Sequence, residues 1–319
     1  MTTKRTSATA LSCAIVIGVA AVAAQPAQAE FPERPINIIV GLGAGGGTDA
    51  TIRALAEPLS EILGQPILVQ NRPGAGGAVA AMSVSTAAPD GYTLVAGNST
   101  SFSLEPQFVD IAYDIDDFDH VAIVLQFQEA FATYADYEFD TLQEMLEAHR
   151  ESGEPIQYAS YYQVDRLITG YLAEREGVTF DPIPHGGAGP AITSVLGGHG
   201  AFTISGGSFA PHVASGEMKI LGSAMRDRLE RFPDYASMAD LGFDVGAENH
   251  LLISAPRGVP EDVLRRLADA IAEAMDDPQV ERVLESRFMR KSVHLLDEVA
   301  PILERQFDMY GQMIAATND

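Results

Sequence analysis

Short apolar strands, glycine- or serine-rich turns and helical patterns follow one another repeatedly along this chain. In the first instance, the apolar run 36–40 leads through the glycine-rich run 41–46 into residues 48–63, where apolar side chains recur every three or four positions. Strands that alternate with helices pack as a sheet with helices on its faces. The alternation therefore predicts an α/β fold whose sheet is largely parallel.

The same periodicities place the remaining elements. Further strands are predicted at 66–70, 92–96, 121–125, 130–134, 156–160, 182–184, 201–205, 219–224 and 251–255. A capping box at Thr141 and Glu144 begins a helix that runs to about residue 152. Other helices are predicted at 75–88, 165–176, 190–196, 209–214, 261–275, 278–287 and about 297–315.

Two lobes are expected from this order of elements. The chain is predicted to leave the first lobe near residue 122 and to return near residue 240. Lobe 1 then comprises residues 30–122 and 241–319, and lobe 2 comprises residues 123–240. Two crossings make a hinge with a ligand cleft between the lobes, which is the usual geometry of closure around a ligand.

The first residues have the pattern of a secretory signal peptide. Lys4 and Arg5 precede an apolar, uncharged run at 8–24, and Ala27-Gln28-Ala29 follows. This arrangement predicts cleavage after Ala29, so that residues 1–29 are removed; a membrane anchor is the alternative, but the run is short for a span. Because the only cysteine is Cys13, the mature chain is expected to have no disulfide, no thiolate nucleophile and no cysteine-bound metal.

The chain is strongly acidic, with 44 Asp and Glu against 20 Lys and Arg and a formal charge of −24. A field of this sign disfavours binding to nucleic acid and to anionic membranes. Two interpretations of the acidic surface remain open. It is either an ordinary solvated surface or an adaptation to salty surroundings, where charge repulsion is screened.

The run 41–46 also fits G-x-G-x-x-G, the turn of dinucleotide-binding folds. In those folds an acidic residue ends the second strand and binds the ribose, whereas here that strand ends in Val69, Gln70, Asn71 and Arg72. A dehydrogenase is therefore disfavoured and no cofactor is predicted. Glycines still let a backbone approach a ligand closely, and helix N-terminal amides bind anions. Thr48 or Asp49 acting only as helix caps is the alternative.

Similar turns follow other predicted strands, at 97–101, 186–189 and 205–208. Open α/β sheets bind ligands at the carboxyl ends of their strands. Each turn alone is an ordinary connection, but several at one edge predict a cleft of amides and hydroxyls suited to a small carboxylate. The sequence has no G-x-S-x-G or H-E-x-x-H motif and its histidines are scattered. No catalytic residue and no metal site is predicted.

Several strings are shared with a known family. Asn-Arg-Pro-Gly-Ala-Gly-Gly at 71–77 and Ala-Pro-Asp-Gly-Tyr-Thr-Leu at 88–94 are the most specific, and further matches extend to Asp-Pro at 277–278. On these residues the chain resembles the substrate-binding proteins of tripartite tricarboxylate transporters, the Bug (TctC-like) family of bacterial periplasmic binding proteins.

The resemblance implies a two-lobed α/β periplasmic-binding-protein fold with a ligand cleft between the lobes, and no enzymatic activity. It implies a periplasmic protein, expected to be a monomer, that delivers one small di- or tricarboxylate, amino acid or aromatic acid to membrane permease subunits. Carried over by position, the candidate ligand-binding residues are Ala44, Gly45, Gly46, Gly47, Thr48 and Asp49 in the first loop, Asn98, Ser99 and Thr100 in a second turn, and Ser160 in lobe 2.

Lobe 2 departs from the family pattern. After Tyr158-Ala159-Ser160 the family usually continues with a Gly/Ser-rich loop, whereas this chain has two tyrosines; the family's Pro-Tyr-Lys-Gly is here Pro-His-Gly-Gly. The remaining candidates come from these segments: Tyr161, Tyr162, His185, Gly186, Gly187 and Ser205. Aromatic rings in place of glycines predict a bulkier or aromatic acid. A ligand-loaded adaptor for an extracytoplasmic sensor kinase remains the alternative function.

Overall fold

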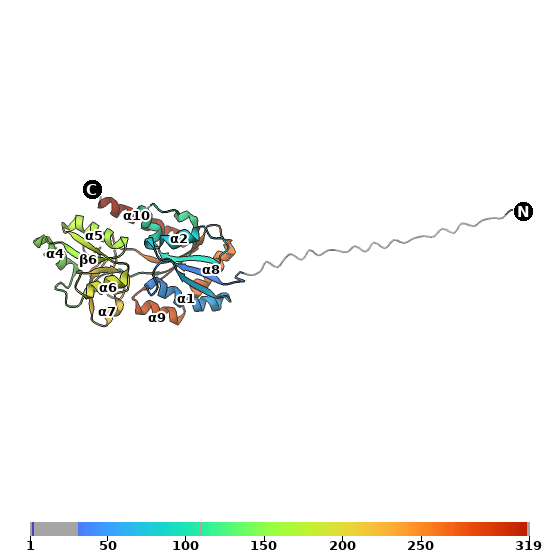
Figure 1. Ribbon diagram of the computed structural model, residues 1–319, viewed down its shortest axis with the longest axis horizontal. Coiled ribbons are helices and arrows are strands. Elements are labelled where there is room, and N and C mark those ends of the chain that lie inside the picture. The colour runs from blue at the N-terminus through green and yellow to red at the C-terminus, as the bar shows by residue number, and fades with distance from the viewer. Residues whose placement is uncertain (1, 3–30, 109, 318–319) are drawn as a thin grey trace. The chain divides into compact units, whose positions relative to one another are not determined.

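A six-stranded mixed sheet joins the first and last parts of the chain. Its strand order is β11-β4-β10-β3-β1-β2. The strands are β1 (Ile36–Val40), β2 (Ile67–Asn71), β3 (Thr93–Asn98), β4 (Phe118–Gln126), β10 (His250–Pro256) and β11 (Arg290–Leu295). The computed structural model describes residues 2, 31–108 and 110–317 (Figure 1), so the predicted signal peptide, including Cys13, lies outside the described residues apart from Thr2.

The prediction of a largely parallel sheet is wrong. β2 and β3 run parallel to β1, but β10 is antiparallel to both β3 and β4, and β11 is antiparallel to β4. An apolar run specifies a buried strand but not the direction of its neighbour. The alternation of strands and helices in the first part of the chain therefore does not predict the direction of the strands that follow.

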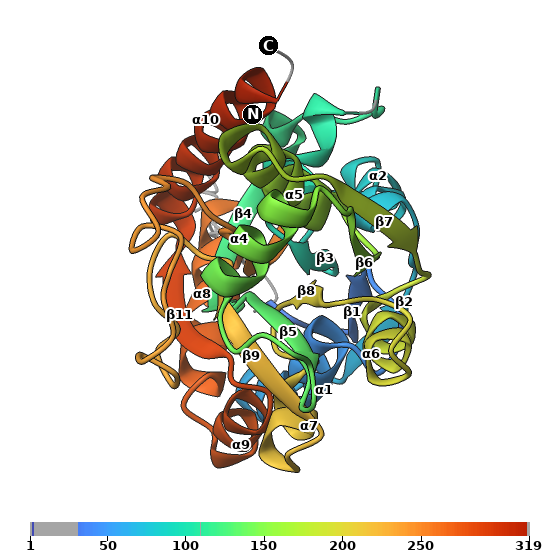
Figure 2. The same cartoon turned by 90° about the vertical axis from the view of Figure 1, so that its left-hand side faces the viewer.

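The middle of the chain forms two smaller sheets. One has the order β8-β5-β9 and is antiparallel, and the other is the parallel pair β6-β7. The strands are β5 (Ala130–Tyr134), β6 (Ile156–Ser160), β7 (Phe180–Pro184), β8 (Thr203–Ser205) and β9 (Met218–Ser223). Figure 2 faces this part of the molecule and shows β7 next to α5 (Gln163–Glu176).

The helices divide between these sheets. In Figure 1, α1, α2, α8 and α9 lie with the six-stranded sheet, and α4 to α7 lie with the smaller sheets. Their bounds are α1 (Gly47–Leu63), α2 (Ala78–Ser85), α3 (Thr100–Ser103), α4 (Leu142–Ser152), α6 (Ala188–Leu196), α7 (Ala210–Ala214), α8 (Glu261–Ala274), α9 (Pro278–Ser286) and α10 (Ala300–Ala316). None of the helices in the described residues is long and apolar enough to cross a membrane.

Local sequence signals explain where the helices begin and end. The predicted capping box of α4 is confirmed: Thr141 Oγ1 accepts from the Glu144 amide at 3.2 Å, and Glu144 Oε2 accepts from the Thr141 amide at 3.2 Å. α4 and α1 end at Gly153 and Gly64, with φ of 71° and 69°. This left-handed conformation favours glycine and closes a helix.

The six-stranded sheet and the two smaller sheets pack against separate clusters of buried side chains. Ile52 and Leu55 of α1 are fully buried against the six-stranded sheet, and each buried side chain of this size stabilises the fold by about 1.5–3 kcal/mol. Around the smaller sheets, Tyr158 stacks on Phe202 with ring centroids 5.2 Å apart. α10 joins the second cluster through Tyr310, although it follows the last strand of the six-stranded sheet.

Two segments connect the sheets. β4 continues to Gln126 within the six-stranded sheet before β5 begins at Ala130, and β9 ends at Ser223 before β10 begins at His250. The expected crossing near residue 122 therefore falls inside β4. These connections matter for the site because residues of both face the same cavity.

Candidate ligand-binding site

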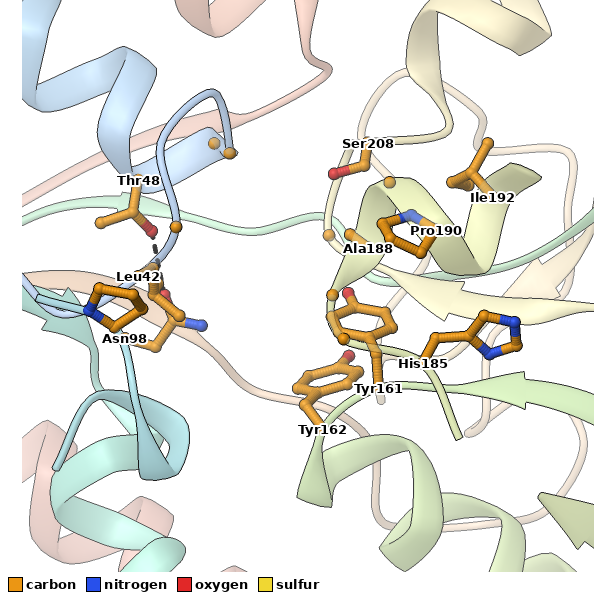
Figure 3. A pocket seen from close by; sticks show the side chains of 18 of the residues that line it. Leu42, Thr48, Asn98, Tyr161, Tyr162, His185, Ala188, Pro190, Ile192 and Ser208 are labelled. Carbon is orange, nitrogen blue, oxygen red and sulfur yellow. Dashed lines mark hydrogen bonds between the residues drawn. The ribbon is translucent and has the colours of Figure 1, made fainter. Parts of the chain in front are cut away.

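A cavity of about 1480 Å³ lies between residues of the six-stranded sheet's loops and residues of the smaller sheets. Figure 3 shows Thr48 and Asn98 on one side of the cavity and Tyr161, Tyr162 and His185 on the other. The lining contains many glycines and few charged side chains. Backbone groups and hydroxyls therefore make up much of its polar surface.

The glycine loop between β1 and α1 is held in shape by Asp49. Asp49 is 3 % exposed, and its side chain accepts hydrogen bonds from the Gly45 amide, from Asn71 Nδ2 and from Arg53 Nε at 2.8, 2.8 and 2.9 Å. Burial raises the pKa of Asp49, but these donors outweigh burial and leave that pKa below its ordinary value. The carboxylate is thus occupied inside the loop.

The N-terminus of α1 opens onto the cavity. Gly46 is extended at the start of the helix, with φ −69° and ψ 173°, and Gly47 and Thr48 line the cavity. The first N–H groups of a helix have no carbonyl partner within it and carry a partial positive charge. Arg287 Nη2 donates to the Gly45 carbonyl at 3.2 Å, which places a guanidinium beside the same loop. This arrangement suits an anion.

The turn after β3 adds polar groups on the same side. Thr48 Oγ1 donates to Asn98 Oδ1 at 3.1 Å, which orients the Asn98 amide in the cavity wall (Figure 3). Thr100 also lines the cavity. Ser99 is fully buried and its Oγ accepts from the His250 amide at 3.0 Å, so it ties β3 to β10.

Two stacked tyrosines form the opposite wall. The rings of Tyr161 and Tyr162 have centroids 4.4 Å apart and planes 18° apart. Asp165 fixes their backbone, because its Oδ2 accepts from both tyrosine amides at 2.8 and 3.2 Å and its Oδ1 accepts from Ser160 Oγ at 2.7 Å. Burial raises the pKa of Asp165 to about 6 despite these donors. The aromatic pair is thus anchored at the start of α5.

His185 and two glycines continue this wall. The His185 amide donates to the Ser160 carbonyl at 2.8 Å and the ring Nδ1 lies 2.7 Å from the Ile183 carbonyl. Gly186 and Gly187 lead into α6, and Gly187 has φ 153°. The loop thus presents an imidazole and a helix start to the cavity.

A carboxylate and an amide lie where the two connecting segments meet. Glu129, just before β5, is 1 % exposed, and its Oε2 accepts from Tyr162 Oη at 2.8 Å. Asn249, just before β10, is 2 % exposed and donates from Nδ2 to Glu129 Oε1 at 3.4 Å. Burial raises the pKa of Glu129 to about 7. Both residues line the cavity.

The structure brings most of the predicted site residues to this cavity. The predicted residues that line it are Ala44, Gly45, Gly46, Gly47, Thr48, Asn98, Thr100, Tyr161, Tyr162, His185, Gly186 and Gly187. Asp49, Ser99, Ser160 and Ser205 do not line it. Asp49, Ser99 and Ser160 turn inward to brace neighbouring backbone or side chains, and Ser205 is fully buried at the end of β8, where the next residue, Gly206, takes the place on the wall.

Several lining residues were not predicted as site residues, among them Phe127, Glu129, Asn249 and Arg287. A signal existed for Glu129, because it is the only acidic residue between Asp119 and Asp136. Phe127 and Asn249 follow or precede strands without a glycine turn, and Arg287 follows α9, far along the chain from the glycine loop. Only the tertiary fold brings these residues to the cavity.

Comparison with known proteins decides the family. A family model described as "Tripartite tricarboxylate transporter family receptor" matches residues 51–318. The chain belongs to this family. Members of the family are solute-binding proteins rather than enzymes. No group of three or more potential metal-ligating side chains is present in the described residues of this receptor.

Individual relatives agree over most of the chain. It is 32% identical to the "UPF0065 protein in gbd 5'region" of Cupriavidus necator over 265 residues, covering 82% of this receptor and 81% of the relative. It is 31% identical to the protein BugT of Bordetella pertussis, with 83% and 84% covered.

Solved structures share the fold. The periplasmic binding protein BugD aligns with a TM-score of 0.80 at 23% identity, covering 90% of this chain and 99% of BugD. MatC from Rhodopseudomonas palustris, solved with malate, gives 0.75 at 24% with 89% and 100% covered, and an R. palustris protein solved with adipate gives 0.81 at 20% with 91% and 99% covered. The α/β fold is thus that of periplasmic binding proteins.

Proposed function

We propose that this protein is a periplasmic solute-binding protein that captures a small organic carboxylate for a tripartite tricarboxylate transporter. The observation that carries the proposal is the α1 N-terminus, which faces the cavity through Gly47 and Thr48 with Arg287 beside the same loop. Hydrogen bonds to a charged group contribute about 1.5–3 kcal/mol each, so two helix amides and a guanidinium form a favourable binding position for one carboxylate.

The hinge follows from the strand order. We infer two lobes that meet at the connecting segments, with crossings between Gln126 and Ala130 and between Ser223 and His250. The cavity of about 1480 Å³ is larger than the ~300–1,000 Å³ of ordinary ligand sites. We therefore infer that this form is open and that ligand binding closes it.

The opposite wall gives the ligand's other end an aromatic surface. The stacked Tyr161 and Tyr162 and the imidazole of His185 lie across the cavity from the glycine loop (Figure 3). An acid with a hydrophobic or aromatic body packs on such rings and keeps its carboxylate at α1. The closed form, a monomer, is then recognised by the membrane permease subunits.

Dicarboxylates are the first acids to test, because two proteins with this fold were solved with malate and adipate. The experiment is a thermal-shift screen of the purified protein against malate, adipate, citrate and aromatic acids, at low and high salt. The matched control for each acid that binds is its neutral amide, in which every carboxylate is replaced by a carboxamide. A ligand at 100 times its dissociation constant stabilises the folded state by about 2.7 kcal/mol.

Binding acids are expected to raise the melting temperature, and their neutral amides are expected to leave it unchanged. A screen in which no carboxylate shifts the transition at either salt concentration contradicts the proposal. A shift by the amides equal to that by the acids contradicts the role of the anion site.

A further inference from the structure

Glu129 is a buried carboxylate without a cationic partner. Its two hydrogen bonds come from the hydroxyl of Tyr162 and, at a long 3.4 Å, from the amide of Asn249. Among the described residues, no Lys, Arg or His nitrogen lies within ion-pair distance of this carboxylate. The nearby charge that acts on it is Asp165, another acid. Isolated buried carboxylates are costly, so their retention needs a reason.

Asn249 presents a second acceptor at the same place. Its Nδ2 is directed to Glu129, which leaves Oδ1 buried with no hydrogen-bond partner in the described residues. Buried polar atoms are almost always paired, and an unpaired one indicates a missing ligand or water. Glu129 thus accepts one short and one long hydrogen bond, Asn249 Oδ1 accepts none, and both residues line the cavity.

The turn after β8 leaves room for this arrangement. A Cβ placed on Gly206 would lie 2.8 Å from Glu129 Oε1 and 2.8 Å from Phe127 Cβ. Any larger residue at position 206 would push the carboxylate from its place. Gly206 also lines the cavity. The sequence thus provides both the acid and the space that it occupies.

Phe127 links this corner to the glycine loop. A Cβ placed on Gly47 would lie 3.3 Å from Phe127 Cε1, whereas the Cβ of Phe127 lies against Gly206. One phenylalanine side chain therefore lies beside both the first residue of α1 and the turn that packs on Glu129. A small ligand that carries an anionic group and a cationic group close together can engage both places.

We propose that Glu129 and Asn249 form an acceptor subsite for a protonated amino group, and that Glu129 is the residue that makes this receptor prefer amino acids to simple carboxylates. This inference rests on the proposed function, because it places the ligand's carboxylate at α1. An ammonium group has three donors and a positive charge. It satisfies Asn249 Oδ1 and a Glu129 oxygen together and neutralises the buried acid.

Matched ligand pairs test the inference. The pairs are succinate with L-aspartate, adipate with L-2-aminoadipate, and 3-phenylpropanoate with L-phenylalanine, measured by titration calorimetry on the wild type, E129Q and E174Q. Glu174 is exposed on α5 and serves as the control. E129Q is expected to weaken binding of the preferred amino acid by about 30-fold or more, because it neutralises one partner of a buried charge pair. The matched simple acid is expected to keep or gain affinity, and E174Q to match the wild type.

The pH dependence has opposite signs for the two members of a pair. Burial holds the pKa of Glu129 at about 7 in the empty site, so an ammonium ligand binds more tightly, by up to about tenfold, as pH rises from 6 to 8. A simple acid binds more weakly over the same range. Tyr161 and Tyr162 face Glu129 from the start of α5 together with Asp165, and Tyr310 acts on it from α10. His185, His199 and His212 also line the cavity, and comparison within a matched pair isolates the effect of Glu129 because the two ligands differ only in the ammonium group.

Equal loss of both ligands in E129Q, or tighter binding of the amino acid at lower pH, overturns the inference. If simple acids bind and their amino derivatives never bind more tightly, the subsite is wrong but the proposed function stands. If no member of any pair binds, the proposed function fails instead. Should E129Q not fold, the wild-type comparison across pH decides alone.

Discussion

The brace at Asp49 gives a prediction that separates structural support from direct ligand contact. In D49N, Oδ1 still accepts from Asn71 and Arg53, but Nδ2 replaces the oxygen that now accepts from the Gly45 amide at 2.8 Å. Two donors then face each other. Leaving a buried donor unpaired costs about 1–3 kcal/mol, and the half-exposed Arg53 pair adds only a few tenths, so about 1–2 kcal/mol of unfolding free energy is expected to be lost.

Calorimetry and ligand titration measure the two consequences. The melting temperature of D49N is expected to fall by about 2–6 °C. Affinity for the strongest acid of the screen is expected to fall about tenfold, because Gly45 no longer holds the loop in place. E261Q, which removes a surface ion pair with Arg265, is the control and is expected to change neither quantity. Lost affinity with unchanged stability refutes the reasoning, because it means that Asp49 touches the ligand.

Three further predictions follow from other contacts. G206A is expected to cost more free energy of ligand binding than free energy of unfolding, because its Cβ meets Glu129 Oε1 at 2.8 Å. An affinity equal to that of the wild type in titration calorimetry contradicts this. In the ligand-free protein, the pKa of Glu129 is about 7 in the folded state and 4.5 in the unfolded state. The folded state therefore holds this proton more tightly, and the stability that results is fully present below pH 4.5 and is lost as pH rises through about 7. E129Q is expected to remove this pH dependence from the melting temperature, and parallel melting temperature profiles for the two proteins refute the prediction. Y310F removes the hydroxyl that donates to the Glu248 carbonyl at 2.5 Å and is expected to cost about 1 kcal/mol in denaturant unfolding; no loss means that the hydrogen bond does not help to anchor α10.

The sequence predicts local structure better than it predicts which strands pair and in which direction. The α4 capping box, the glycine that ends α1 and the strands with clear apolar runs were predictable because each depends on neighbouring residues. The antiparallel insertion of β10 between β3 and β4 was not, since it depends on partners far away in the chain. β11 was also missed, because its sequence, Arg-Lys-Ser-Val-His-Leu, has no continuous apolar run.

The candidate site also has parts that the sequence predicts and parts that it does not. The glycine loop could be named from the sequence because a glycine turn after a strand is visible there, and the segment at Tyr161 and Tyr162 could be named from its departure from the family pattern. The orientation of individual side chains could not be predicted from the sequence. Ser160 turns inward to Asp165, whereas Glu129, from the short connection between β4 and β5, lines the cavity. Whether a residue in a turn faces a ligand or braces the turn depends on hydrogen-bond partners that only the fold brings near.

A structure of the protein in complex with the strongest acid of the screen tests the account most directly. We predict that one carboxylate of the ligand lies within hydrogen-bond distance of the Gly47 or Thr48 amide at the start of α1, and that the rings of Tyr161 and Tyr162 close over the rest of the ligand. A ligand bound away from the α1 N-terminus would contradict the account.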